Sequence, residues 1–263
     1  MAQGTNETFG QNPVQYKNFE WQYFDSENFR TLFYLGGQDV GQYALQYAEH
    51  VLPEIEAMLE WKLRRKTFIL VYNDLSDLNQ TNIGHGLEIN NTGGLTQIID
   101  NKVFVYFNGS YENLEKQIRQ GITRVIMNHI LFGSNFQEVL QNAVLLNLPP
   151  WFTNGLIEYM GESWNTEKDS RLREGILSGK YEKFNRLRDE EANFAGSAFW
   201  HYVEEKYGKS AVSNLLYLTR INRSMESGFM FVLGEGVKES LNQWYEYYLS
   251  QFQSDYALRD SLN

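Results

Sequence analysis

The sequence predicts an α+β protein in which a small mixed β-sheet and one long helix come first and a mostly helical half follows. Short apolar runs of strand length dominate the residues before 108, and apolar side chains three and four apart dominate those after it. The chain of 263 residues is 42% hydrophobic and 15% aromatic, which is ample material for a core. We therefore expect a globular protein of class α+β.

The first part of the chain predicts strands around a single long helix. Residues 39–61 place apolar side chains at helical spacing, and they follow two short strand-like runs. Asp100 and Asn101 separate two further apolar runs, which predicts a tight hairpin after a surface loop rich in Gly and Asn. Strands are expected at 19–24, 28–35, 66–73, 95–99 and 102–107.

The second part predicts a series of helices. Ser110 can cap the first of them, which carries an apolar stripe at Leu114, Ile118, Ile122, Val125, Ile126, His129 and Ile130. Further helices are expected at 135–147, 151–161, 193–208, 210–221 and 237–252. Because no Pro- or Ser-rich linker occurs, we expect 1–263 to form one domain, with a strand-rich part at 9–108, a helical part at 109–253 and a tail at 254–263.

Charge and composition narrow the class of partner. The net charge of −10 disfavours a nucleic-acid partner, because phosphate backbones are bound by clustered Lys and Arg. The basic run at 62–66 is expected to lie in solvent beside a strand. The chain contains no cysteine and no run of about 18 apolar residues, so disulfides, thiol nucleophiles and a transmembrane helix are excluded. The polar N-terminus is no signal peptide, so either the protein is cytoplasmic or a leader has been removed.

Familiar catalytic and metal-binding motifs are absent from the sequence. None of its four histidines has a second histidine at i+3 or i+4, and no nucleophile elbow or phosphate-binding loop occurs. His129 lies on the apolar stripe and is interpreted as a core residue, whereas His85 lies in the Gly-flanked loop. Glu158 and Glu162 are one helical turn apart, a spacing typical of a solvated face. No cofactor and no metal are expected.

Two segments taken together resemble a known family. "FNGSYENLEKQIRQGITRVIMN" and "LPPWFTNGLIEYMG" resemble the core of the peptidase MA-like, thermolysin-type zincins (gluzincins). The resemblance is to the bacterial envelope proteins in which such a domain precedes a Tol-type β-propeller, and it extends from about Phe9 to about Phe252. It implies a zincin-like fold and an exported protein, periplasmic or associated with the outer membrane, whose leader has been removed.

The four positions that carry chemistry in that family differ here. The family's first helix bears H-E-x-x-H, and its second reads W-x-x-E-G-x-A-E-Y. Gln120 and Arg124 occupy the histidine positions, Gly121 the position of the catalytic glutamate, and Asn154 that of the third ligand. The surrounding pattern is kept at Trp151, Gly155, Glu158 and Tyr159.

Each of these replacements disables metal catalysis on physical grounds. Neutral amides are weak zinc ligands, and a permanently charged guanidinium repels a dication. Gly121 provides no general base for an attacking water. In place of zinc, we expect Arg124 to form an ion pair with Glu158 or Glu162 across the two helices, with amide hydrogen bonds from Gln120 and Asn154.

The resemblance then implies a catalytically inactive domain that binds a protein or peptide, or serves as a scaffold, in the bacterial envelope. The family's substrate-binding edge strand corresponds to residues 93–99 here, and strand addition needs no catalytic group. Its central residues are Gly94, Leu95, Thr96, Gln97 and Ile98. Two alternatives are an active metallopeptidase with displaced ligands such as His85, His129 or Glu158, and a purely structural domain that orients a following β-propeller.

Overall fold

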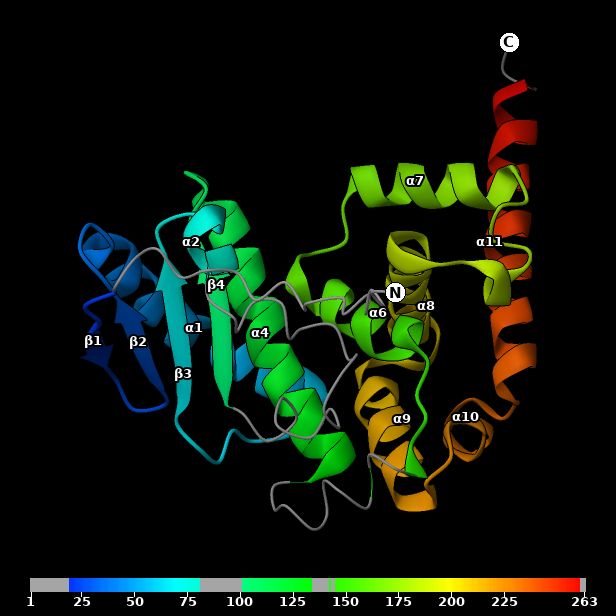
Figure 1. Ribbon diagram of the computed structural model, residues 1–263. Coiled ribbons are helices and arrows are strands. Elements are labelled where there is room, and N and C mark those ends of the chain that lie inside the picture. The colour runs from blue at the N-terminus through cyan, green and yellow to red at the C-terminus, as the bar shows by residue number, and fades with distance from the viewer. Residues whose placement is uncertain (1–18, 81–100, 134–141, 143–144, 261–263) are drawn as a thin grey trace, which may run out of the picture.

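The computed structural model describes residues 19–80, 101–133, 142 and 145–260. A small mixed sheet with a long helix is followed by a mostly helical half, which confirms the predicted α+β class (Figure 1). The loop with His85, the expected edge strand from Gly94 to Ile98 and most of the helix expected at 135–147 lie outside the described residues.

Four strands form the sheet in the order β1-β2-β3-β4. β1 pairs antiparallel with β2, whereas β2, β3 and β4 pair in parallel, so the sheet is mixed as predicted. The strands span Gln22–Asp25 (β1), Phe29–Phe33 (β2), Thr67–Tyr72 (β3) and Lys102–Tyr106 (β4). The expected hairpin partner of β4 falls outside the described residues.

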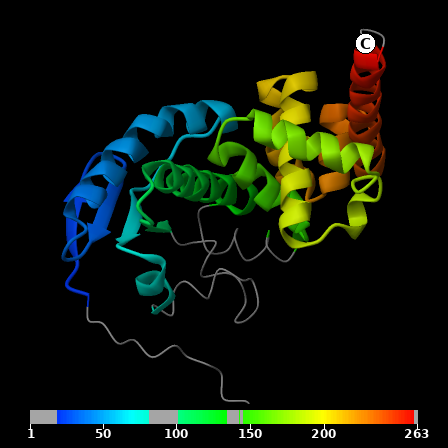
Figure 2. The ribbon, with the colours of Figure 1, turned by 90° about the horizontal axis from the view of Figure 1, so that it is seen from above.

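Alternating side chains give the sheet two apolar faces. Ile69 and Val103 are register partners on one face and belong to the main core, together with residues of the long helix α1 (Gln38–Leu59). Leu70 and Phe104, one position along, belong to a smaller cluster on the other face. Figure 2 shows α1 on one side of the sheet and the short helix α2 (Leu75–Gln80) on the other.

Helix α4 (Tyr111–Phe132) joins the sheet to the helical half. The Ser110 side chain accepts a hydrogen bond from the backbone N–H of Asn113 at 3.2 Å, which confirms the predicted cap. All seven residues of the predicted apolar stripe are buried, including His129, whose Nε2 lies 3.0 Å from Asn101 Oδ1. The interpretation of His129 as a core residue is therefore confirmed.

Among the described residues, the helical half contains two α-helices that the sequence pattern did not predict, α7 and α10, and a short 3-10 helix at Phe184–Arg186. Its helices are α6 (Pro150–Gly161), α7 (Thr166–Leu177), α8 (Asp189–Tyr207), α9 (Lys209–Asn222), α10 (Met225–Leu233) and α11 (Val237–Asp260). α11 continues to Asp260, so the segment expected to be a tail from 254 begins as helix. One hydrophobic core runs from Phe29 in the sheet to Phe252 in α11.

Two glycines let α6 and α8 approach each other closely. A Cβ on Gly155 would lie 2.7 Å from the carbonyl carbon of Gly196, and one on Gly196 would lie 2.2 Å from the carbonyl oxygen of Trp151. The Trp200 indole N–H donates to the backbone carbonyl of Phe152 at 2.8 Å and fixes the crossing. α6 is therefore held rigidly on the side away from α4.

Gly121 explains how α4 approaches the sheet. A glycine inside a helix costs about 1 kcal/mol relative to alanine. A Cβ at this position would lie only 2.2 Å from Val103 Cγ1 on β4, so either the valine side chain or the strand would have to move. The helix lies against β4 because residue 121 has no side chain.

We expect Gly121→Ala to lower the free energy of unfolding by about 1–3 kcal/mol through overpacking, although alanine is the better helix former. Val103→Ala alone also destabilises the protein, because it leaves a cavity. In the double variant the new methyl group occupies the vacated space, so denaturant unfolding should show losses well below the sum of the single ones. Additive losses would contradict the contact.

Candidate binding site at the junction of α4 and α6

The candidate site is built on the contact between α4 and α6. The Arg119 Nε–H donates to the backbone carbonyl of Met160 at 3.0 Å, and its terminal nitrogens pair with Glu54 of α1. A Cβ on Gly161 would lie 2.7 Å from Gln120 Cγ, so Gln120 rests against the C-terminal end of α6. These contacts place the two sequence segments that carry the family resemblance side by side.

Three of the four residues that the resemblance aligns with chemical positions, Gln120, Arg124 and Asn154, are polar. Gln120 and Arg124 are four apart and share a side of α4 away from the buried stripe, and Asn154 lies one turn before Glu158 on α6. The side chains of Gln120, Arg124 and Asn154 are each partly buried. Within the described residues, none of the three takes part in a hydrogen bond or an ion pair.

Arg124 is partly buried, and no negatively charged group among the described residues stabilises its guanidinium there. Desolvation is the cause that lowers the pKa of this guanidinium, and no carboxylate contributes to raise it. A partly buried cation without a partner destabilises the folded state, because its lost hydration is not replaced. Arg124 is therefore a strong donor group that the described part of the chain leaves unused.

The expected ion pair of Arg124 with Glu158 or Glu162 is absent from the described residues. Glu162 is instead held by Lys116 of α4, with Nζ 2.7 Å from Oε1, and by Lys168 of α7, at 3.2 Å. Two cations already share this carboxylate, so it has little negative charge left to stabilise Arg124. A cross-link between α4 and α6 does exist, but Lys116 provides it. The expected amide hydrogen bonds of Gln120 and Asn154 are likewise not formed there.

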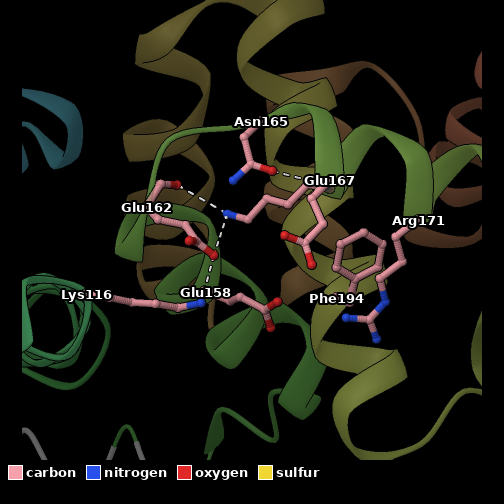
Figure 3. A pocket seen from close by; sticks show the side chains of 8 residues that line it. Lys116, Glu158, Glu162, Asn165, Glu167, Arg171 and Phe194 are labelled. Atoms are coloured by element: carbon pink, nitrogen blue, oxygen red, sulfur yellow. Dashed lines mark hydrogen bonds and ion pairs between the residues drawn. The ribbon is translucent and has the colours of Figure 1, made fainter. Parts of the chain in front are cut away.

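A pocket of about 240 Å³ opens beside this cross-link (Figure 3). It lies where α4 and α6 meet the N-terminal part of α7 and one residue of α8. Six of its lining residues carry charge, which makes it a polar pocket of mixed sign. The lining consists of Lys116, Glu158, Glu162, Asn165, Glu167, Lys168, Arg171 and Phe194.

Glu158 is the unusual group of this pocket. Burial raises its pKa, although Lys116, Lys168 and Arg171 act in the opposite direction. Its carboxylate is partly buried and has no hydrogen-bond donor among the described residues. By contrast, Arg171 pairs with Glu191 at 2.9 Å. The spacing of Glu158 and Glu162 suggested a solvated face, but both line the pocket.

Sequence reasoning missed Lys168 and Arg171, because α7 was not predicted. The helix is strongly charged, and Leu172 and Ile176 are its buried residues of large apolar type, so it lacks a clear periodicity. One sequence signal could have revealed α7, because an Asn followed by acidic residues is typical of a helix start. In the structure the Asn165 side chain caps α7 by accepting a hydrogen bond from the backbone N–H of Lys168 at 3.0 Å.

The described residues contain no group of three His, Asp or Glu side chains placed to hold a metal ion. His129, one of the displaced ligands considered, is bonded to Asn101 in the core. His201 stacks on Trp164 with ring centroids 4.3 Å apart and lies 3.5 Å from Glu205. The idea of a displaced zinc site thus gains no support from these histidines.

No protein-family model matches the chain, and no curated protein is similar to it in sequence. Among the helices of the described residues, none is both long and apolar enough to cross a membrane.

The pH dependence of stability should identify Glu158. Its folded-state pKa is raised, so the folded state favours the protonated form, and stability falls as the pH rises through that pKa. Glu158→Gln removes this loss. We expect the variant to melt above the wild type near pH 7.5, and the difference to vanish below about pH 4, where glutamate is protonated in both states.

Glu167→Gln is the matched control, because Glu167 lines the same pocket but is exposed. Its melting temperature should follow the wild type at both pH values. A Glu158→Gln variant that is less stable than the wild type at neutral pH would show that the ionised carboxylate has a partner.

Proposed function

We propose that this chain is a non-catalytic binding domain of the bacterial cell envelope that captures a carboxylate-bearing segment of a protein or peptide at the junction of α4 and α6. One observation supports the proposal: Gln120, Arg124 and Asn154 are all partly buried without partners in the described residues. The sequence resemblance aligns the same three residues with the metal ligands of the zincins. The envelope location rests on the same resemblance.

The absence of catalysis follows from the chemistry at these positions. Two amides and a guanidinium are a poor ligand set for zinc, and the guanidinium charge opposes a dication. The general-base position is also closed sterically, because a Cβ at residue 121 would collide with Val103. Several changes, one of them in the packing of α4 on β4, separate this site from a working peptidase.

Binding follows from the unused donors. A guanidinium presents planar, paired N–H groups that match the two oxygens of a carboxylate, and such bonds are stronger than neutral ones. Gln120 and Asn154 each add an amide that can donate to or accept from an extended backbone. The ligand that fits is a peptide segment with an Asp, a Glu or a C-terminal carboxylate facing Arg124.

The test is binding of a displayed library of random peptides to the intact protein, followed by affinity measurements on the enriched sequences. We expect enrichment of acidic or C-terminally free peptides and a loss of about ten-fold or more in affinity for Arg124→Ala, which corresponds to about 1.4 kcal/mol. A chelator should leave binding unchanged.

Arg186→Ala serves as the control, since Arg186 is exposed and its removal changes the net charge equally. If both substitutions weaken peptide binding equally, the effect comes from the overall charge of the protein, which would contradict a binding site at Arg124. Peptides that bind without any acidic preference, and equally well to Arg124→Ala, would favour the edge-strand or purely structural alternatives.

A further inference from the structure

The charged side chains that line the pocket of Figure 3 do not include Arg124 and can be considered separately from it. All three cations in its lining are already paired. Glu162 forms ion pairs with Lys116 at 2.7 Å and with Lys168 at 3.2 Å, and Glu191 forms one with Arg171 at 2.9 Å. The lining therefore offers no spare positive charge to an anionic ligand.

The carboxylates of the lining, unlike its cations, are not all paired among the described residues. Glu162 is saturated by its two lysines, whereas Glu158 and Glu167 accept no hydrogen bond within the described part of the chain. Glu167 is exposed and can be satisfied by water. Glu158 is partly buried, and Figure 3 shows its carboxylate among the side chains of the lining. The unmet requirement of this pocket is a hydrogen-bond donor for Glu158.

We propose that the pocket binds a primary ammonium or guanidinium group, with Glu158 as its acceptor and Glu167 at the exposed part of the lining. A positively charged donor restores the hydration that Glu158 loses on burial. A divalent metal fits less well, because the described residues contain no group of three acidic or imidazole side chains placed to hold one. The volume of about 240 Å³ suits one such group rather than a folded partner.

The experiment is a titration of the full chain, followed by NMR or calorimetry, with N-acetyl-arginine amide and with its citrulline counterpart. The two probes have nearly the same shape, but only the first is charged. We expect the arginine probe to bind at least ten-fold more tightly, and Glu158→Gln to weaken its binding at least ten-fold.

Glu246→Gln, an exposed substitution on α11, is the charge-matched control and should bind the arginine probe like the wild type. Arg124→Ala should also bind it normally, so failure here and failure of the function proposed above are distinguishable. The probe comparison on the wild-type chain stands even if Glu158→Gln is poorly folded.

Equal binding of the arginine and citrulline probes would overturn the proposal, and so would unchanged binding by a folded Glu158→Gln. The absence of binding at probe concentrations of about 10 mM would also overturn it. A peptide with one internal arginine distinguishes the sources of the cation. Tighter binding than the amide assigns the pocket to a basic side chain of a protein, and equal binding assigns it to a free organic cation.

Discussion

The close approach of α4 to β4 at Gly121 and Val103 determines the rest of the architecture. It fixes the depth at which α4 lies against the sheet, and α4 in turn contacts α6 through Arg119 and Gln120. It also places residue 121 where no side chain fits. Under the resemblance to zincins, residue 121 corresponds to the general base, and the contact with Val103 leaves no room for a side chain there.

Charge pairing organises the other side of the junction. Glu162 draws together Lys116 of α4 and Lys168 of α7, so one carboxylate connects three helices. Arg124 and Glu158, of opposite charge, have no partner among the described residues and lie on neighbouring helices. Proteins usually remove such groups or pair them, because buried and unpaired charge is destabilising. The presence of both groups without partners in the described residues is the physical basis for the two proposed ligands: a carboxylate for Arg124 and a cation for Glu158.

The sequence was sufficient for the features that depend on apolar periodicity. The stripe of α4, the buried strand β3 and the class α+β follow from spacing alone, and all are found. It was insufficient where charge determines structure. α7 lacks a clear apolar period, so its Lys168 and Arg171 could not be anticipated. The sequence therefore predicts an ion pair of Arg124 with Glu158 or Glu162, whereas Lys116 and Lys168 pair with Glu162. The choice among several cations for one carboxylate depends on distances that residue spacing along one helix does not specify.

The proposed site requires Gln120, Arg124 and Asn154 to converge as the ligands of a zincin do. The most direct test is zinc binding by the triple variant Gln120→His, Arg124→His and Asn154→Glu, with Gly121 kept to preserve the contact with Val103. We expect about one tightly held zinc per folded chain, from two imidazoles and one carboxylate, with no peptidase activity because the base is still missing. A folded triple variant that binds no zinc would show that these positions do not converge and would contradict the proposed site.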